Sequence, residues 1–495
     1  MGIPLKSLLQ GIEIVSVEGL ETPITGIHYD SRQVKPGFIF VAIKGFRTDG
    51  HFYLNEALAR GARGLLVERE VPVPPGVAWA RVKNTRRALA SLAANFYNHP
   101  SRKLTLIGVT GTNGKTTTTH LIEAVLRARG TRTGLIGTVW NKIGEKKLSV
   151  LHTTPESLEL QALLREMVDS GVGAVAMEVS SHGLVLERTA ECEFDVGVFT
   201  NLTQDHLDFH KDLKDYLTAK MLLFTGLGRN RTKKRPCYAV VNLDDAAGEE
   251  IARSVKPPVI TYGIREKADV KAEDIKLSAR GTAFTVMYQK QEIPFSLSLP
   301  GEFNIYNALA AICVGLQEGI EVSSLQETLQ KAKGVPGRFE VIDQGQSFTV
   351  VVDYAHTPDG LENILRTSRT LTQGKVLTVF GCGGDRDPGK RPLMGRIAAE
   401  LSDFTIITSD NPRSEDPGKI LTQIEAGLKQ IGGARYLVIE DRYEAIRAAL
   451  HQAQAGDFVV IAGKGHEGYQ IIGDKVIPFN DRLVAQEIIT KEILS

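Results

Sequence analysis

A short glycine-rich segment could bind phosphate. Residues 110–117 read Thr-Gly-Thr-Asn-Gly-Lys-Thr-Thr and stand between an apolar run at 104–109 and a helical pattern that ends at Gly130. Glycines let backbone N–H groups wrap a phosphate, and the N-terminus of the following helix adds a favourable field. We therefore predict a phosphate loop in which Lys115 reaches the β- and γ-phosphates of ATP and Thr116 contacts Mg²⁺. The predicted contacts are Thr110, Gly111, Thr112, Asn113, Gly114, Lys115 and Thr116.

This loop departs from the general phosphate-loop pattern. The first glycine position of G-x-x-x-x-G-K-[ST] falls on Val109, and Gly108 lies one residue earlier. A plain glycine turn is therefore the alternative reading of the segment.

Polar side chains also follow two predicted strands further along the chain. The apolar run at 174–179 carries Glu178 at its end, and the run at 196–199 leads into a segment that contains Asp205 and His206. In open parallel sheets, ligands bind beyond the carboxyl ends of the strands, so a carboxylate and an imidazole could complete the Mg²⁺ shells around ATP. The alternatives are a salt bridge for Glu178, a helix cap for Asp205 and a surface position for His206.

One lysine lies on the apolar face of a predicted helix. Lys220 shares its stripe with Leu213, Leu217 and Phe224 at helical spacing. A buried and unpaired ammonium is costly, so this lysine should be paired, shifted in pKa or chemically altered. The alternative is a side chain that runs along the edge of the stripe to reach solvent.

Several domains must position these residues, because 495 residues exceed one hydrophobic core. Residues 1–101 predict a small N-terminal α/β domain, with a linker at 98–101. Residues 102–335 predict a central P-loop parallel-sheet ATPase domain, since strands and helices alternate there. After a break near 333–337, residues 336–495 predict a C-terminal Rossmann-like α/β domain. Its expected strands are 348–352, 376–380, 404–408 and 458–462, and in the N-terminal domain we expect a strand at 37–42 and a helix at 54–60.

Composition excludes several classes of protein. Lys and Arg number 59 against 58 Asp and Glu, so the net charge of +1 gives no basic field for nucleic acid. No run approaches the ~20 apolar residues of a spanning helix, so membrane insertion is not expected. There is no signal-peptide pattern and no C-x-x-C pair, which predicts a cytoplasmic protein with free thiols, and we expect a monomer. The four cysteines are Cys192, Cys237, Cys313 and Cys382.

Several of these motifs resemble those of the Mur ligase family. The phosphate loop is similar to the Thr-Gly-Thr-Asn-Gly-Lys-Thr form of Mur ligases and folylpolyglutamate synthetases, and Tyr216-x-x-Ala219-Lys220 looks like the motif whose lysine is carbamylated in Mur ligases. The resemblance spans nearly the whole chain. It implies an ATP-dependent amide-forming ligase of cell-wall synthesis that works through an acyl phosphate, with two Mg²⁺ ions. The implied catalytic residues are Lys115, Lys220, Glu178 and His206, and the implied metal contacts are Thr116, Glu178, His206 and a carbamate on Lys220.

The resemblance also assigns the adenine and ribose side of ATP. Residues 301–311 resemble the family segment whose asparagines face the nucleotide, which here are Asn304 and Asn307. Arg338 and Asp353 lie in two further family segments, where phosphate and ribose are bound. From the residues alone, 301–311 is a capped helix entry, and Asp353 with His356 could form an N-cap turn before Pro358.

The acceptor implied by the resemblance is UDP-MurNAc-L-Ala-D-Glu. Segments 29–32 and 45–50 resemble those that hold the UDP portion, and Thr153-Thr154-Pro155-Glu156 reads as a helix N-cap with proline at the first helical position. His152 stands where members often have Asn, and Leu186 where some have Gln. The predicted acceptor contacts are Ser31, Thr48, His152, Thr153, Thr154, Ser180 and Arg188.

The incoming amino acid implied by the resemblance is meso-diaminopimelate. Residues 410–413 resemble the signature of diaminopimelate-adding members, and Arg413 could bind the distal carboxylate bidentately while Asp410 accepts from the distal ammonium. The alternative is a type I turn with a solvated arginine. Cys382 in a nearby glycine loop has no evident base, and we interpret it as a bystander. The predicted contacts are Arg386, Asp410, Asn411, Pro412, Arg413, Gly463 and Glu467.

Four other functions are considered. They are an L-lysine-adding Mur ligase, a folylpolyglutamate synthetase, a P-loop kinase acting on a hydroxyl, and a nucleotide-gated binding protein without chemistry. The UDP-type N-terminal segments and residues 410–413 speak against the folate enzyme. Products separate the rest, because a kinase yields a phosphoester and a binding protein yields neither phosphoester nor amide.

Overall fold

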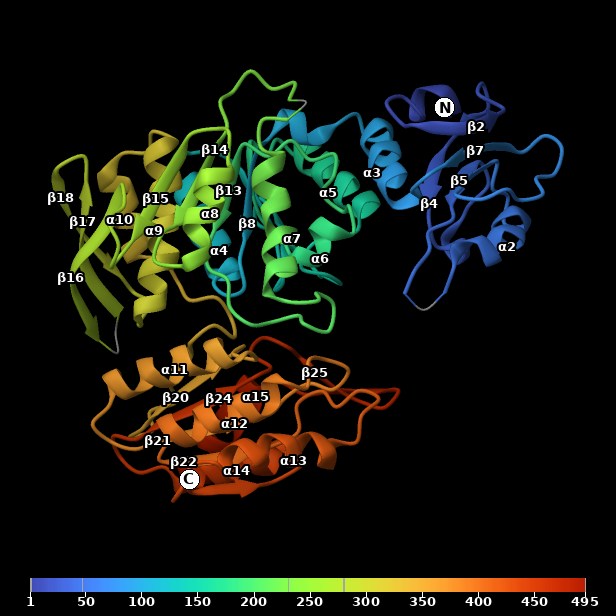
Figure 1. The fold of residues 1–495 in the computed structure, drawn as a ribbon. Coiled ribbons are helices and arrows are strands. Elements are labelled where there is room, and N and C mark those ends of the chain that lie inside the picture. The colour runs from blue at the N-terminus through green and yellow to red at the C-terminus, as the bar shows by residue number, and fades with distance from the viewer. Residues whose placement is uncertain (1, 47, 230, 279–280, 495) are drawn as a thin grey trace.

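The computed structural model describes residues 2–46, 48–229, 231–278 and 281–494. It contains three α/β domains, each built on its own sheet. Figure 1 shows the blue N-terminal domain beside one end of the middle domain and the orange C-terminal domain beneath the middle domain. In the part of the chain that the structure describes, no helix is long and apolar enough to cross a membrane.

The N-terminal domain contains a five-stranded sheet in the order β2-β7-β6-β5-β4. Four strands are parallel, and β2 joins the edge in the antiparallel direction. The predicted strand at 37–42 and helix at 54–60 are confirmed as β5 and α2, and the 3-10 helix Pro100–Lys103 occupies part of the predicted linker. The strands and helices are β1 (Ile3–Pro4), α1 (Leu5–Leu8), β2 (Ile14–Glu18), β3 (Pro23–Ile24), β4 (Gly26–His28), β5 (Phe38–Val41), α2 (Leu54–Ala59), β6 (Gly64–Val67), β7 (Ala78–Val82) and α3 (Thr85–Phe96).

The middle domain is built on an eleven-stranded sheet in the order β11-β10-β9-β12-β8-β13-β14-β15-β16-β17-β18. The predicted parallel arrangement is confirmed for the seven central strands, but antiparallel strands extend both edges of the sheet. The strands are β8 (Thr105–Thr110), β9 (Thr133–Ile136), β10 (Asn141–Ile143), β11 (Lys146–Leu148), β12 (Ala174–Glu178), β13 (Val196–Phe199), β14 (Tyr238–Asn242), β15 (Val259–Gly263), β16 (Val270–Ser278), β17 (Gly281–Tyr288) and β18 (Gln291–Leu297).

Helices cover both faces of this sheet (Figure 1), which explains why its central strands are apolar along their whole length. Helices α4 and α9 pack together on one face through a cluster that includes Ile107, Val125 and Leu309. Helices α5 and α7 contribute Leu164 and Phe224 to the cluster on the other face. The helices are α4 (Lys115–Ala128), α5 (Ser157–Asp169), α6 (Ser181–Val185), α7 (Leu213–Gly226), α8 (Ala246–Ser254), α9 (Glu302–Gln317) and α10 (Val322–Gln330).

The C-terminal domain has a six-stranded sheet in the order β19-β20-β24-β21-β22-β23, parallel except for β19. All four predicted strands are present within one residue of their expected ends. The elements are β19 (Glu340–Ile342), β20 (Thr349–Asp353), α11 (Pro358–Leu371), β21 (Val376–Phe380), α12 (Lys390–Leu401), β22 (Phe404–Ile407), α13 (Pro417–Leu428), β23 (Tyr436–Val438), α14 (Arg442–Gln452), β24 (Phe458–Ala462), the hairpin β25 (Tyr469–Ile472) and β26 (Lys475–Pro478), and α15 (Asp481–Ile488).

The order of the strands brings the candidate residues of each sheet together beyond the carboxyl ends of neighbouring parallel strands. The phosphate loop leaves β8, which lies between β12 and β13, so the segments after all three strands meet at the same edge of the sheet. In the C-terminal domain, β20, β24, β21 and β22 are adjacent and parallel, so the loops that follow them also meet. Each sheet therefore presents one ligand-binding edge.

Candidate active site

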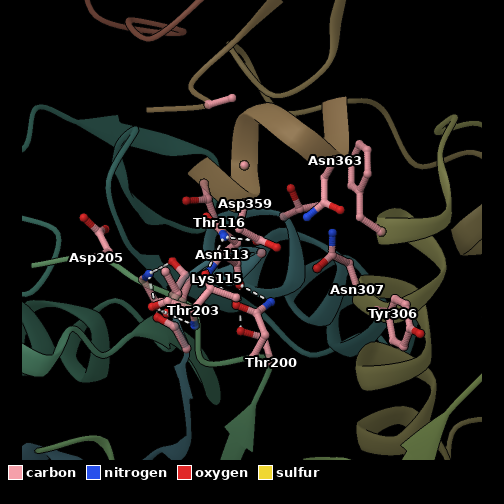
Figure 2. Close-up of a pocket in the computed structure, with 18 of the residues that line it drawn as sticks. Asn113, Lys115, Thr116, Thr200, Thr203, Asp205, Tyr306, Asn307, Asp359 and Asn363 are labelled. Carbon is pink, nitrogen blue, oxygen red and sulfur yellow. Dashed lines mark hydrogen bonds between the residues drawn. The ribbon is translucent and has the colours of Figure 1, made fainter. Parts of the chain in front are cut away.

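A cavity of about 610 Å³ lies between the middle and C-terminal domains. The phosphate loop, Glu178, Asp205 and Lys220 line it from the middle domain, and Asp353 is among the residues that line it from the C-terminal domain. Figure 2 shows Lys115 and Thr116 below Asp359 and Asn363 of helix α11 in the C-terminal domain, with Asn307 and Tyr306 to one side. The two ligand-binding edges therefore share one cavity.

The phosphate loop fits closely around its glycines. Gly111 and Gly114 have φ angles of +152° and +83°, and a Cβ at either would meet the side chain of Thr200 or Asn307. The Nζ of Lys115 donates to the carbonyls of Gly111 and Thr112, at 2.9 and 2.7 Å. This lysine folds back over its own loop, close to where phosphates bind such loops. A plain glycine turn would require none of these contacts.

Glu178 is buried at the end of β12 and accepts three hydrogen bonds. Thr116 Oγ1 donates to its Oε2 at 3.0 Å, while the backbone N and Oγ1 of Thr138 donate to the carboxylate at 2.8 and 3.0 Å. Within the described ranges its partners are these two threonines and it forms no ion pair, so the salt-bridge alternative is wrong. Its carboxylate and the Thr116 hydroxyl face the cavity together.

His206 lies in an irregular segment after β13, with a φ of +56°. No helix begins at Asp205, so the capping alternative is wrong, and the His206 side chain lines the cavity with 34% of its surface exposed. Burial lowers the pKa of His206 to about 3. The imidazole is therefore neutral near pH 7 and keeps a lone pair for a metal.

Lys220 is buried on α7, with 1% of its surface exposed, so the solvent-reaching alternative is wrong. Its Nζ lies 4.0 Å from the centre of the Tyr216 ring and has no hydrogen-bonding or ionic partner among the described residues. Burial, reinforced by the positive charge of Lys115, holds the pKa of Lys220 well below its usual value. The sequence predicted a paired, shifted or altered lysine, and the structure has one that is unpaired and shifted.

The donors in the cavity suit Mg²⁺ only together with a nucleotide. Among the described residues, no group of three or more His, Cys, Asp or Glu side chains is arranged to hold a metal. Mg²⁺ is usually bound by one or two carboxylates plus water and substrate phosphates. The Glu178 carboxylate, the Thr116 hydroxyl and the neutral His206 ring fit such a partial set.

Of the two asparagines predicted to face the nucleotide, only one lines the cavity. Asn307 lines the cavity and accepts from Thr118 Oγ1 at 3.1 Å. Asn304 does not line it, because its amide binds the carbonyl of Pro300 at 2.8 Å and the Asn307 side chain at 3.1 Å. Asn304 therefore supports Asn307. Tyr306, whose OH donates to Asp244 at 2.7 Å, lines the cavity although we did not predict it as a contact.

Two residues of the C-terminal domain that we predicted on the ATP side line the cavity, and one of them, Arg338, reaches the phosphate loop. Arg338 Nη2 donates to Thr116 Oγ1 at 3.1 Å, and its guanidinium lies 4.4 Å from the centre of the Tyr354 ring. Asp353 accepts from the backbone N of Phe339 at 2.6 Å, and burial raises its pKa. The N-cap of α11 is Thr357, so neither Asp353 nor His356 caps that helix.

The sequence missed one contact between these domains. Asn113 Nδ2 of the phosphate loop donates to Asp359 Oδ2 at 2.6 Å (Figure 2). Asp359 is in the first turn of α11, where an acidic residue is ordinary, and only the packing of the domains brings it to the loop. Asp244, by contrast, stands two residues after the end of β14, so the rule that ligands bind beyond strand ends could have found it.

The predicted acceptor residues fall into two groups in different domains. In the middle domain, Thr154 Oγ1 donates to the carbonyl of Glu178 at 3.0 Å and lies 3.0 Å from Ser180 Oγ, while Arg188 Nη1 donates to the Thr154 carbonyl at 2.9 Å. Thr153 Oγ1 lies 3.0 Å from Thr138 Oγ1, and His152 is exposed.

The expected helix start at Thr154 is wrong. Helix α5 begins at Ser157 with Glu156 as its N-cap, because the Thr154 hydroxyl is used by the Glu178 carbonyl. In the N-terminal domain, Ser31 Oγ donates to Glu56 at 2.8 Å and Thr48 Oγ1 lies 3.1 Å from the OH of Tyr53. Arg47, within the predicted 45–50 segment, lies outside the described residues.

Most of the predicted amino-acid residues meet beyond β22 and β24. Arg413 is half-buried with a φ of +52°, pairs in a β-bridge with Ile472 and donates to the carbonyl of Gly384 at 2.7 Å. It is not a solvated arginine on a turn, so that alternative is wrong. Asp410, Asn411 and Pro412 are buried beside it, with Glu467 close to Asn411.

Two further residues border this pocket. Arg386 is exposed, and its Nη1 donates to the carbonyl of Asp385 at 2.8 Å, so it is not drawn into the buried group. Cys382 is buried against the sulfur of Met394 at 3.7 Å, and burial raises its pKa to about 12. Such a thiol is not a nucleophile near pH 7, which confirms the bystander interpretation. All four cysteines are free, as predicted.

Known proteins are similar to this chain along its whole length. Family models match at residues 23–97 (Mur ligase family, catalytic domain), 109–315 (Mur ligase middle domain) and 337–465 (Mur ligase, glutamate ligase domain). A UDP-N-acetylmuramoyl-L-alanyl-D-glutamate–2,6-diaminopimelate ligase of Syntrophomonas wolfei is 47% identical over 490 residues, which are 99% of each chain.

Solved structures agree with this result. A structure of a UDP-N-acetylmuramoyl-L-alanyl-D-glutamate–2,6-diaminopimelate ligase is 35% identical, with a TM-score of 0.68 over 100% of both chains. A MurF ligase from Thermotoga maritima in complex with ADP is 20% identical, with a TM-score of 0.65 over 94% of this chain and 96% of that one. The second likeness shows the fold alone.

Proposed function

Because the chain belongs to the Mur ligase family, we propose that it is an ATP-dependent ligase that joins meso-diaminopimelate to UDP-MurNAc-L-Ala-D-Glu in peptidoglycan precursor synthesis. The observation that carries this proposal is the cavity shared by the phosphate loop, Lys220 and the C-terminal domain. We assign the UDP portion to residues 1–101, ATP to 102–335 and the amino acid to 336–495. The reaction uses a nucleotide-linked precursor and ATP, which suits the cytoplasm.

The proposed reaction has two steps. The γ-carboxylate of the D-Glu residue attacks the γ-phosphate of ATP, which gives an acyl phosphate and releases ADP. The free amine of diaminopimelate then attacks the acyl carbon, phosphate leaves, and the amine loses a proton as the amide forms. Glu178, Thr116 and His206 would hold Mg²⁺, which would offset the negative charge of the phosphates.

The chain's own cations act on the transferred phosphoryl group. Lys115 lies on the phosphate loop, and Arg338 reaches Thr116 from the other domain, so positive charge approaches from both sides of the cavity. Charge placed in advance, where the reaction develops it, is the main source of catalysis in phosphoryl transfer. The Asn113 contact with Asp359 and the Arg338 contact with Thr116 help to close the two domains over ATP, which excludes water from the acyl phosphate.

Lys220 is the residue that we propose to be carbamylated. A neutral amine can add to CO₂, forming an N–C bond and losing one proton, and the product is an anion. The buried, unpaired and pKa-lowered Lys220 supports this modification, and it lines the same cavity as Glu178 and His206. The carbamate would turn a buried amine that has no partner into a metal-binding anion.

The rival functions explain fewer of the observations. A folylpolyglutamate synthetase does not account for relatives that match 99% of the chain and are named for a UDP-linked substrate. L-Lysine has no distal carboxylate for Arg413. Analysis of products from ATP, UDP-MurNAc-L-Ala-D-Glu and diaminopimelate tests the proposal, because it requires ADP, phosphate and a new amide in equal amounts. A phosphoester, or ATP hydrolysis without an amide, would overturn it.

A further inference from the structure

The amino-acid pocket contains a buried lysine that the proposed mechanism does not use. Lys464 follows β24, and none of its side chain is exposed. Its Nζ lies 3.0 Å from Glu467 Oε2 and 3.2 Å from Asn411 Oδ1. An ammonium buried to this extent requires partners, so its position is fixed by these two residues.

Lys464, Asn411 and Glu467 form a closed ring of hydrogen bonds. Asn411 Nδ2 donates at 2.8 Å to the same Glu467 oxygen that Lys464 binds. Asn411 Oδ1 also accepts from the backbone N of Ile471 at 2.9 Å, so the amide is held in one orientation. Oε2 of Glu467 therefore has two donors, whereas Oε1 has none in the described part of the chain.

Asp410 differs from Glu467 because its carboxylate has no hydrogen-bonding or ionic partner within the described ranges, although it is only 7% exposed. Gly463 leaves room for it, since a Cβ at that position would lie 2.6 Å from Asp410 Oδ2. Arg413 uses Nη1 on the Gly384 carbonyl and keeps its other nitrogens for a ligand.

The charges of the pocket follow from these contacts. Lys464 and Glu467 offset each other, which leaves one carboxylate on Asp410 and one guanidinium on Arg413 without an opposite charge in contact. Arg386 adds a cation only at the exposed rim, where water and salt screen it. The buried part of the pocket is therefore balanced for a group that carries one positive and one negative charge.

We propose that Lys464 is a positioning residue that sets this charge balance, so that the pocket takes a side-chain end with both an ammonium and a carboxylate and disfavours an end with an ammonium alone. The inference rests on the proposed function and names a residue that selects the substrate. Without the Lys464 charge, two carboxylates and one guanidinium would face the ligand. The pocket would then bind a purely cationic end, such as that of L-lysine, more tightly relative to diaminopimelate.

Lys464→Met tests the proposal, because it removes the charge and keeps a long apolar side chain. We expect KM for diaminopimelate to rise at least about 10-fold, with kcat at saturation within about 3-fold of the unmodified enzyme. The ratio of kcat/KM for diaminopimelate to that for L-lysine should fall at least about 10-fold. Lys464→Arg keeps the charge, so its ratio should stay close to that of the unmodified enzyme.

Lys233→Met is the matched control. Lys233 is also buried and paired, with Asp195 at 2.6 Å, but it lies in the middle domain. Its loss should lower the melting temperature and leave the amino-acid ratio unchanged. If Lys464 had only a structural role, Lys464→Met would behave in the same way, with less active enzyme, a lower kcat and an unchanged ratio, and that result would overturn the proposal.

A second pair of variants covers the case in which Lys464→Met does not fold. Glu467→Gln and the double variant Lys464→Met/Glu467→Gln differ only at Lys464, and the double variant removes both charges of the Lys464–Glu467 pair, so neither partner is left buried alone. The ratio of kcat/KM for diaminopimelate to that for L-lysine should be lower in the double variant than in Glu467→Gln. Equal ratios would contradict the proposal. An unmodified enzyme that forms no amide with either amino acid would remove the proposed function itself, whereas a diaminopimelate-selective enzyme with unchanged ratios in these variants would remove only the role of Lys464.

Discussion

The phosphate-loop side of the cavity and the amino-acid pocket differ in how far their charges are already paired within the protein. Lys115 contacts only backbone carbonyls, and Lys220 contacts only an aromatic ring, so neither cation has a carboxylate partner among the described residues. In the amino-acid pocket, Lys464 pairs with Glu467, and Asp410 and Arg413 remain without an opposite charge in contact among the described residues. In the same domain, the fully buried Arg442 pairs with Asp481.

This difference shows where each site obtains its specificity. The first site leaves its two lysines unpaired for groups that arrive later, namely phosphate at Lys115 and CO₂ at Lys220, so the loss of either lysine should remove chemistry with little cost to folding. The second site is organised before the ligand binds, so its charges select the ligand and also stabilise the domain. Four substitutions test this contrast.

Removal of Lys115 should have the largest effect. Lys115→Ala takes away a phosphate-binding charge that has no carboxylate partner, so we expect kcat to fall about 10⁴-fold or more. The melting temperature should stay close to that of the unmodified protein. Phosphate release measures the first quantity and thermal unfolding the second. The control is Lys146→Ala, which removes a largely exposed lysine of the same domain, and near-normal phosphate release by Lys115→Ala would refute the phosphate-loop assignment.

Removal of Lys220 should be almost as severe. Lys220→Ala loses the proposed carbamate, and kcat should fall about 10³-fold or more. A small carboxylic acid such as acetate should restore part of the activity, because it supplies the missing anion. Mass spectrometry under CO₂ should detect the carbamate on the unmodified protein. A bare amine in active enzyme, together with an active Lys220→Ala variant, would rule the modification out.

Removal of Arg413 should lower kcat/KM for diaminopimelate and leave the KM for ATP almost unchanged. Loss of a charge-assisted, bidentate contact should cost about 2 to 4 kcal/mol, or roughly 30- to 1000-fold in kcat/KM for diaminopimelate. The KM for ATP should remain within about 3-fold of its normal value. Arg413→Ala should not become a good lysine ligase, because the substitution removes a contact for diaminopimelate and adds none for the side chain of L-lysine. An unchanged kcat/KM for diaminopimelate would count against the assignment.

The contact between the domains should have the smallest effect. Asp359→Ala removes the hydrogen bond to Asn113, which should raise KM for ATP by about 5- to 10-fold, as expected for roughly 1 to 1.5 kcal/mol. Glu362→Ala is the control, since Glu362 is on the same helix but pairs with Arg366 at the surface. Equal KM values for the two variants would show that the 2.6 Å contact does not help to hold ATP.

Much of this arrangement could be predicted because its signals are local in sequence. The phosphate loop combines a strand, glycines and a helix start within a few residues, and the apolar strands of both larger sheets have no polar face. The antiparallel edge strands β17 and β18 were missed because their alternating residues lie outside the parallel core.

Contacts between distant segments could not be predicted in the same way. Asp359 sits 246 residues from Asn113, and nothing in its local sequence separates it from an ordinary first-turn carboxylate. Lys464 stands between the predicted Gly463 and Glu467, but its role depends on Asn411, 53 residues away. Thr154 resembled a helix cap until the structure showed that its hydroxyl binds the Glu178 carbonyl.

The central claim is that the chain forms an amide with meso-diaminopimelate at the expense of ATP. The most direct measurement is amino-acid-dependent phosphate release with UDP-MurNAc-L-Ala-D-Glu, comparing meso-diaminopimelate, L-lysine and L-ornithine, with the product mass determined in parallel. We predict stoichiometric ADP, phosphate and UDP-linked tripeptide with diaminopimelate, and a kcat/KM for L-lysine lower by about 30-fold or more. Equal use of L-lysine and diaminopimelate, or phosphate release without a new amide, would contradict this account.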